Sequence, residues 1–197
     1  LPAGCVVLGI VLQAVVGGIT VHMDLNPFIV ALHFMLSMLL VTASAWLVWR
    51  GREGDGPKRP LVPTPIAVVA KIAAVLAFVV LVLGTMVTGS GPHSGDADEP
   101  ARTGWDARSV AWLHADTVML FCGLVVAVLL SLFVLRSPAT TRRTWIGLLV
   151  ITLLQGVLGY VQYFTGVPWV PVLFHMLGAC LLVTWMTWAL CSLRERP

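Results

Sequence analysis

Long apolar runs alternate with short polar connections along this chain, and that pattern alone predicts its main elements. Six runs carry little or no charge, at residues 3–21, 27–49, 66–88, 108–135, 145–164 and 168–191. A helix that crosses a bilayer needs about 20 apolar residues in succession. Each run meets that requirement, so we expect an all-α, polytopic membrane protein with six transmembrane helices.

Composition supports a membrane protein and the charges predict its orientation. Hydrophobic residues make up 58% of the chain and charged residues only 11%, which is too apolar for a soluble domain. The net charge of +3 does not indicate nucleic-acid binding, because the basic residues stand in short connections. Loops rich in Lys and Arg face the cytoplasm. On this rule the cytoplasmic groups are Arg50, Arg52, Lys58 and Arg59; Arg136, Arg142 and Arg143; and Arg194 and Arg196. Lys71 can snorkel to the same interface.

The chain contains an internal repeat at an offset of 142 residues. The offset aligns the first two runs with the last two and pairs polar and small residues as well as apolar ones. The pairs include Gln13 with Gln155, Gly17 with Gly159, His33 with His175 and Trp46 with Trp188. Chance similarity between apolar helices would not match Gln, Gly, His and Trp in register, so we interpret the pattern as a duplicated unit.

The duplication predicts how the chain is divided. Residues 66–197 form a complete four-helix half, residues 51–65 form a cytoplasmic linker rich in Gly and Pro, and residues 1–50 correspond to the second hairpin of another half. By symmetry we expect two further helices before residue 1. The expected whole is an eight-helix protein with two pseudo-symmetric four-helix bundles.

Three histidines lie about two turns inside their apolar runs: His33, His114 and His175. Ionisable side chains inside a membrane are costly and usually functional. A lone histidine of this kind is most often a hydrogen-bonded core residue, but His114 and His175 belong to different helices of one bundle. Two imidazoles that face each other across a four-helix bundle suit axial ligation of a haem iron. No carboxylate or thiol stands three or four residues after His114, so the usual zinc pattern is absent.

The surroundings of this pair fit a porphyrin. Small residues leave room for a flat macrocycle, aromatic side chains can cover its faces, and nearby cations can pair with its propionates. We expect these roles for Gly156, Gly159, Gly178 and Ala179, for Phe121 and Phe174, and for Arg102 and Arg108, respectively.

The remaining polar residues have simpler interpretations. We expect Gln13, Gln155 and Gln162 to cross-link helices, Asp106 to cap a helix, and His22 and His93 to be solvated loop residues. A proton-handling role or a helix contact is left open for Asp116. The four cysteines, Cys5, Cys122, Cys180 and Cys191, lie in or beside apolar runs and indicate no disulfide framework.

Three stretches resemble the haem A synthase family: LQAVVGGITVHMDLNPFIVALH, VTGSGPHSGD and GYVQYFTGVPWVPVLFH. The resemblance implies that His114 and His175 are the axial ligands of a cofactor haem b, and that His33 binds the iron of the substrate haem O. It further implies an oxidoreductase of the bacterial cell membrane that oxidises the C8 methyl group of haem O to the formyl group of haem A. The implied partners are haem O, haem O synthase and membrane lipid, without nucleic acid; the electron acceptor and a homo-oligomer are left open.

The sequence departs from that family in two respects. The family's first external loop, with a cysteine pair in many members, is absent from these residues, and so is the helix with a glutamate three residues before its ligand histidine. Ala111 stands three residues before His114, which agrees with a cofactor role rather than a catalytic one. The catalytic residue is therefore unassigned, and we expect a protein of only these residues to be inactive.

Two other classes of protein compete with this interpretation. A b-type cytochrome for transmembrane electron transfer would need the ligand pair without a substrate site, and the 142-residue duplication argues against it. A transporter or a structural assembly subunit would contain no cofactor and would show no Soret absorption.

Overall fold

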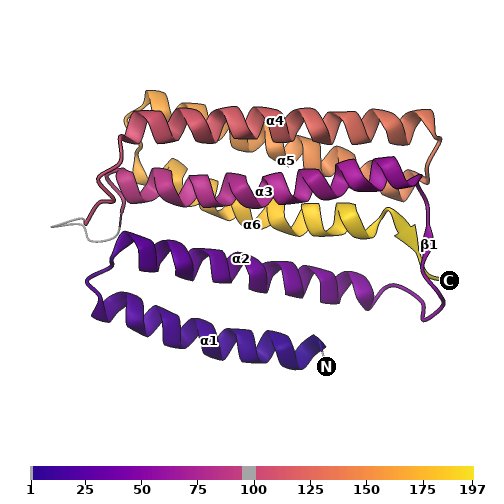
Figure 1. The fold of residues 1–197 in the computed structure, drawn as a ribbon, viewed down its shortest axis with the longest axis horizontal. Helices are drawn as coiled ribbons and strands as arrows, with labels where there is room; N and C mark the ends of the chain where they lie inside the picture. The colour runs from indigo at the N-terminus through magenta and orange to yellow at the C-terminus, as the bar shows by residue number, and fades with distance from the viewer. Residues whose placement is uncertain (1, 95–100) are drawn as a thin grey trace.

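The structure, a computed structural model, describes residues 2–94 and 101–197 and confirms an all-α membrane fold. Its six helices are each long and apolar enough to cross a membrane (Figure 1). Their bounds are α1 Pro2–His22, α2 Pro27–Arg50, α3 Thr64–Ser90, α4 Ala107–Val134, α5 Ala139–Phe164 and α6 Trp169–Cys191. The fifth helix begins before the predicted residue 145, because a polar first turn after Pro138 continues the helix beyond its apolar run.

Two helix starts follow directly from their capping residues. Asn26 accepts a hydrogen bond from the N–H of Phe28, and Pro27 occupies the first turn, where its missing N–H costs nothing. Asp106 accepts a bond of 2.8 Å from the N–H of Ser109, which confirms the predicted cap. Hydrogen bonds from the side chain and backbone of Ser109 hold the pKa of Asp106 below its ordinary value.

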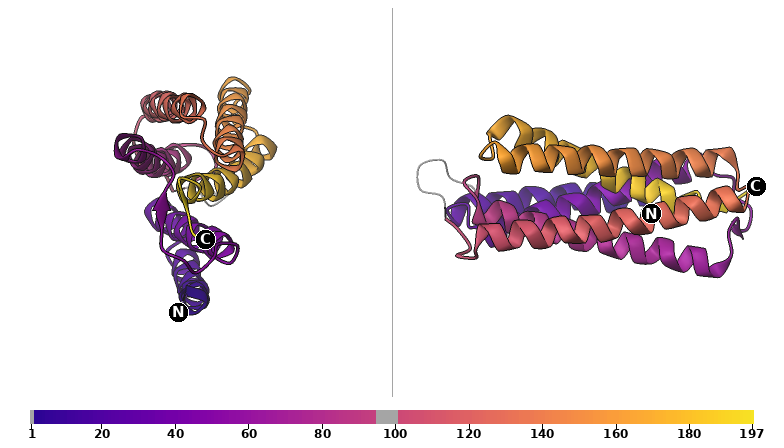
Figure 2. Two further views of the ribbon diagram at one scale, coloured as in Figure 1. Left: turned by 90° about the vertical axis from the view of Figure 1, so that its right-hand side faces the viewer. Right: turned by 90° about the horizontal axis from the view of Figure 1, so that it is seen from above.

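Helices α3 to α6 form a closed four-helix ring. Each packs against the next along the chain, and α3 also packs against α6, so that α4 and α6 lie on one diagonal and α3 and α5 on the other. The hairpin of α1 and α2 lies outside this ring, where α2 packs against α6 and α3. Seen end-on, the hairpin projects from one side of the bundle (Figure 2).

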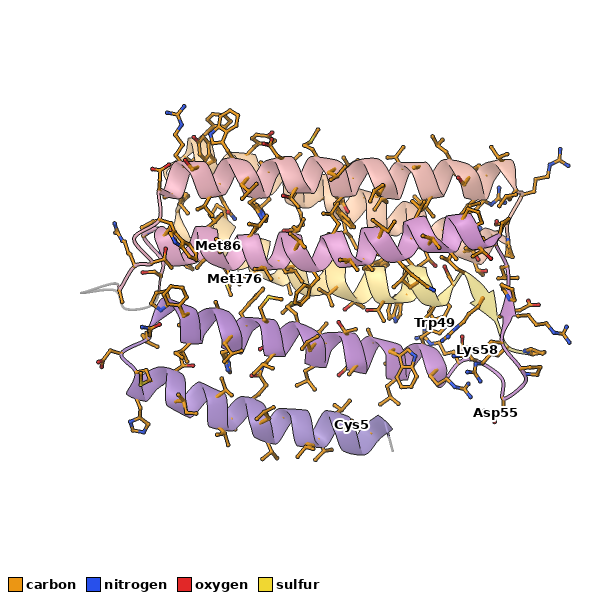
Figure 3. All side chains as sticks on the ribbon, viewed as in Figure 1. Cys5, Trp49, Asp55, Lys58, Met86 and Met176 are labelled. Atoms are coloured by element: carbon orange, nitrogen blue, oxygen red, sulfur yellow. The ribbon has the colours of Figure 1, made fainter. Side chains whose placement is uncertain are left out.

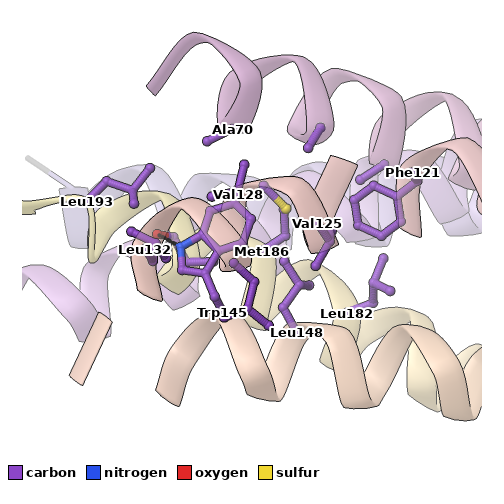
Figure 4. Packing of buried hydrophobic residues seen from close by; sticks show 14 of the residues in the cluster. Ala70, Phe121, Val125, Val128, Leu132, Trp145, Leu148, Leu182, Met186 and Leu193 are labelled. Carbon is purple, nitrogen blue, oxygen red and sulfur yellow. Dashed lines mark hydrogen bonds between the residues drawn. The ribbon is translucent and has the colours of Figure 1, made fainter. Parts of the chain in front are cut away.

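The tightly packed core fills only one half of the bundle's length. Trp145, Leu148, Val128 and Leu132 are almost completely buried there, and Trp145 Nε1 donates a hydrogen bond of 3.1 Å to the carbonyl of Ala189 (Figure 4). Toward the opposite end the core continues through Val125 and finishes near Phe121 and Leu182. His33, His114 and His175 lie beyond that limit of the packed core.

The packed half ends in the polar linker, the turn between α4 and α5, and the C-terminal tail, which we call the basic end. Here β1 (Arg59–Pro60) pairs antiparallel with β2 (Arg194–Glu195), and the N–H of Leu61 donates to the carbonyl of Leu193. The side chain of Glu53 is buried among three arginines: Arg50 at 3.9 Å, Arg194 at 3.7 Å and Arg196 at 3.7 Å. The tail is therefore fastened to the linker between the hairpin and the ring.

The opposite end, which we call the histidine end, contains the turns α1–α2 and α5–α6 and the loop α3–α4. The two turns repeat each other at the 142-residue offset. Asp24 and Leu25 have φ of 50° and 53°, and the equivalent Gly166 and Val167 have φ of 78° and 57°. The N–H of Leu25 donates to the carbonyl of Thr20, and that of Val167 donates to the equivalent carbonyl of Gln162. The duplication thus extends to backbone conformation where the sequences differ.

Two predictions from the sequence are affected by these observations. All four cysteines are free, in agreement with the expected absence of disulfides. Residues 95 and 96 of the motif VTGSGPHSGD lie outside the described part of the chain, while His93 lies inside it. The division into domains and the orientation across the membrane stay predictions.

Candidate functional site

In each of the three hairpins, the histidine of the second helix lies against a glycine of the first helix. The pairs are Gly17 with His33, Gly84 with His114 and Gly159 with His175. A Cβ placed on these glycines would lie 3.3, 3.4 and 3.7 Å, respectively, from the Cε1 of the paired ring. The missing side chain therefore lets the imidazole pack edge-on against the neighbouring backbone.

The same nitrogen is left without a partner in all three rings. Nδ1 of His33, His114 and His175 is buried and accepts or donates no hydrogen bond within the described residues. Burying a polar atom without a partner is unfavourable, and such atoms are rare in folded proteins. Three recurrences at equivalent positions indicate a shared requirement for polar imidazoles at this depth, as a ligand site would have.

His114 and His175 stand on α4 and α6, the two helices of one diagonal of the ring. His114 also lies beside the backbone of Val80 in α3. Both rings belong to the histidine end, where Figure 3 labels Met86 of α3 and Met176 of α6. The structure therefore places both members of the predicted pair at the same end of one four-helix ring, and their role as a ligand pair stays a prediction.

The residues expected to surround a macrocycle differ in their burial and in their neighbours. Nothing lies within 4 Å of a Cβ placed on Gly156, whereas the side chain of Gln155 lies directly against Gly178. Phe121 is buried at the end of the packed core. Phe174 is 56% exposed, so it lies on the outer surface of α6 rather than between the helices. Its place next to His175 explains this, because successive helical residues point about 100° apart.

The cations expected to meet propionates are at the correct end of the bundle. Arg102 precedes α4, Arg108 lies in its first turn, and both are exposed. Their proximity to the histidine end agrees with the predicted role, which stays a prediction.

His33, the remaining histidine of the three, lines a separate groove. This groove has a volume of about 600 Å³ and lies between α1, α2 and α6. His33, Gln13 and Ser37 contribute polar groups to its wall, and Leu40 and Trp188 contribute apolar ones. Gln13 Nε2 donates to the carbonyl of His33 at 3.2 Å and to the hydroxyl of Ser37. The groove therefore combines a half-buried imidazole with both polar and apolar surface.

The expected cross-links by glutamine are mostly confirmed. Gln13 joins α1 to α2 by the bonds just described, and Gln162 Nε2 joins α5 to α6 through the carbonyl of Pro171 at 2.7 Å. Gln155 also contacts α6, at Gly178. Interhelical hydrogen bonds of this kind satisfy polar groups that cannot reach water.

The peripheral polar residues lie apart from the histidine pair. His22 ends α1 and is exposed. His93 is also exposed, but its Nε2 is 2.7 Å from the carbonyl oxygen of Val167, so it connects two loops rather than standing free. Asp116 is exposed on α4, and no ion pair involves it within the described residues.

Comparison with known families gives a relationship for the first half of the chain. Residues 1–94 match the model of the COX15-CtaA family, described as cytochrome oxidase assembly protein. Residues 1–94 are therefore similar to the COX15-CtaA family. The matched segment contains Gly17, His33 and Gly84 of the histidine–glycine pairs, and also Gln13. A COX15-CtaA protein has a role in cytochrome oxidase assembly, and the resemblance noted in the sequence agrees with this.

The match to the COX15-CtaA family ends before α4, so His114 and His175 lie outside it. The internal repeat relates His175 to the matched segment. The hairpin of α5 and α6 reproduces the turn, the glycine and the histidine of the hairpin of α1 and α2. The comparisons with curated proteins and with solved structures found no match.

The sequence analysis did not predict that Gly84 packs against His114. Gly17 and Gly159 stand out because the repeat aligns them, but Gly84 falls in α3, where the 142-residue offset has no counterpart. A usable signal was its position, since all three glycines lie five or six residues before their helix ends. That regularity becomes visible only when the helix ends are known.

Proposed function

We propose that this protein acts in haem A synthesis, as a haem A synthase that oxidises the C8 methyl group of haem O to a formyl group. The observation that carries the proposal is the pair His114 and His175. The two rings come from diagonal helices beyond the packed core, and their buried Nδ1 atoms have no hydrogen-bond partner among the described residues. The family relationship supports the assembly pathway in which haem A is required.

The residues present fit a haem b cofactor. Two neutral imidazoles from separate helices are the donor set for bis-histidine ligation of an iron porphyrin. Gly84 and Gly159 allow the rings to seat against the other two helices of the ring, so the four helices share the site in two equivalent pairs. A bound haem of this kind supplies one-electron transfer.

We assign His33 to the substrate, haem O. It stands in the hairpin outside the four-helix ring, and its groove of about 600 Å³ provides apolar surface for a hydrophobic molecule. Gln13 and Ser37 donate hydrogen bonds to the backbone carbonyl of His33, so the polar groups around it are joined to the backbone of α2.

The proposed reaction is a four-electron oxidation. A methyl carbon gains one oxygen atom from water and releases four protons and four electrons as it becomes a formyl carbon. The electrons must leave one at a time if they pass through a haem b, which gives the cofactor its role beside the substrate. The electron acceptor and the catalytic acid or base are not assigned to any residue here.

The test is a set of histidine variants purified in detergent. We expect His114→Ala and His175→Ala each to lose the low-spin haem spectrum and most of the bound haem b. His33→Ala should keep that spectrum and lose only the binding of added haem O. His22→Ala is the matched control, because His22 is exposed at a helix end.

Two results would count against the proposal. An unchanged spectrum and haem content in both the His114 and His175 variants would remove the cofactor site. A protein that binds haem b at this pair but leaves His33→Ala indistinguishable from wild type in haem O binding would instead be an electron-transfer cytochrome.

A further inference from the structure

A second hollow, at the basic end, contains chemistry that the haem site does not use. It has a volume of about 450 Å³ and lies between α2, the linker, α3 and α6. Three cations and several apolar side chains line it, chiefly Lys58, Lys71, Arg194, Trp46, Val62 and Leu190. We propose that this hollow binds the phosphate headgroup of an anionic phospholipid, and the proposal does not rest on the haem function.

The charge in the hollow is one-sided. No carboxylate is among its lining residues. Lys58 and Lys71 form no ion pair within the described part of the chain, and Arg194 shares the single carboxylate of Glu53 with two other arginines. Three cations that converge with only one shared counter-charge favour an anion between them.

The depth of these cations suits a lipid headgroup. Lys71 stands seven residues into α3, about 10 Å from the helix start, and its long side chain can reach back to the interface. Lys58 is in the linker at the same end of the bundle (Figure 3). Basic pockets between transmembrane helices at a membrane face are typical sites for acidic lipids.

The apolar part of the wall distinguishes a phospholipid from a free phosphate ion. Trp46 is 39% exposed and lies near the end of α2, where an indole suits the boundary between headgroups and acyl chains. Val62 and Leu190 add apolar surface to the same wall. Inorganic phosphate would use the cations alone, whereas a phospholipid would use both parts of the wall.

The experiment measures lipid binding to the delipidated full chain. Native mass spectrometry from a neutral detergent follows titrations with phosphatidylglycerol and with zwitterionic phosphatidylcholine. The test variant is Lys58→Gln with Lys71→Gln. The matched control is Arg136→Gln with Arg143→Gln, which removes the same charge from the same end but away from the hollow.

We expect the wild-type chain to bind phosphatidylglycerol more tightly than phosphatidylcholine. The double lysine variant should lose at least about tenfold in affinity for phosphatidylglycerol, since each basic residue near a membrane contributes roughly fivefold. The arginine control should stay within about twofold of wild type. Lys71→Arg, which keeps the charge, should also bind normally and shows that the position tolerates substitution.

Three results would overturn the proposal. The lysine and arginine variants could bind phosphatidylglycerol equally, or phosphatidylcholine could bind the wild type as tightly. Inorganic phosphate at millimolar concentration could also displace the lipid completely, which would show a simple anion site. If the double variant does not purify, Lys58→Gln alone decides the matter, because Lys58 is exposed in the linker.

Discussion

Glycine decides where the functional side chains of this protein can lie. At Gly17, Gly84 and Gly159 the absence of a Cβ admits a histidine ring against the backbone of the preceding helix. Small residues at helix contacts commonly allow such close approach in membranes. Here the close approach positions an imidazole rather than another helix backbone, and it occurs three times.

A different glycine controls the packed core. A Cβ at Gly147 of α5 would overlap the indole of Trp185, which packs beside Trp188 at 5.2 Å between ring centroids. An indole has no flexible end that can move aside, so we expect Gly147→Ala to destabilise the protein by about 1–3 kcal/mol. The thermal unfolding midpoint in detergent measures this change.

The control for that prediction is Gly123→Ala in α4. Nothing lies within 4 Å of a Cβ at Gly123, and alanine favours a helix over glycine by about 1 kcal/mol. We therefore expect a midpoint equal to or above that of wild type. A lower midpoint for Gly123→Ala than for Gly147→Ala would contradict the packing argument.

At the scale of elements, the hairpin is the repeating unit. The turns after α1 and α5 share their left-handed backbone and their closing hydrogen bonds, although one contains Asp24-Leu25 and the other Gly166-Val167. The equivalent turn geometry sets both histidines at the same depth in the helix that follows. The repeated function therefore depends on the turn as well as on the apolar helices.

The turn after α5 contains a testable strain. Val167 has φ of 57°, a conformation that is costly for a β-branched residue. We expect Val167→Gly to stabilise the protein by about 1 kcal/mol, because glycine adopts this conformation freely. The bond to His93 should survive, since it uses the backbone carbonyl of residue 167.

Thermal unfolding of the purified variant measures the effect. Val170→Gly is its control, because Val170 lies inside α6 and is partly exposed. Val170→Gly should lower the free energy of unfolding, because glycine inside a helix is less favourable than a good helix former by roughly 0.5–1 kcal/mol. The strain argument fails if Val167→Gly unfolds at a lower temperature than wild type.

At the scale of the whole molecule, one end of the bundle is packed and fastened while the other holds the histidines. The buried core, the paired strands and the Glu53 cluster all lie in the packed half. The histidine end contains few fully buried side chains beyond Phe121. A rigid base of this kind can hold four helices in place while their far ends leave the histidine pair accessible to a ligand.

The Glu53 cluster should contribute measurably to that rigidity. The side chain of Glu53 is only 8% exposed, and removal of its charge would leave three arginines without their shared partner. We expect Glu53→Gln to destabilise the protein by about 1–3 kcal/mol and to make the tail more susceptible to trypsin at Arg194.

Asp55→Asn is the matched control for Glu53→Gln. Asp55 also pairs with Arg50, at 2.8 Å, but its side chain is fully exposed, and exposed ion pairs contribute little. Equal unfolding midpoints and equal trypsin cleavage in the two variants would show that burial of Glu53 has no consequence.

The candidate site was predictable in part. His33, His114 and His175 are identifiable from their cost in apolar runs and from the repeat, and the structure places them at equivalent depths. The role expected for Phe174 does not agree with its exposed position, because a run that is apolar on all faces does not show which face points inward. The contact of Gln155 with Gly178 also depends on how α5 and α6 pack, which no single helix reveals.

The sequence by itself determined the six helices, the duplicated hairpin and the depth of each histidine, because helix length, apolar character and fixed rise per residue are local properties. Only the tertiary structure decided which helices share a diagonal, which glycines receive the rings, and that the tail closes over the linker. These features depend on contacts between distant segments. In a chain whose helices are apolar on every side, periodicity does not specify such contacts.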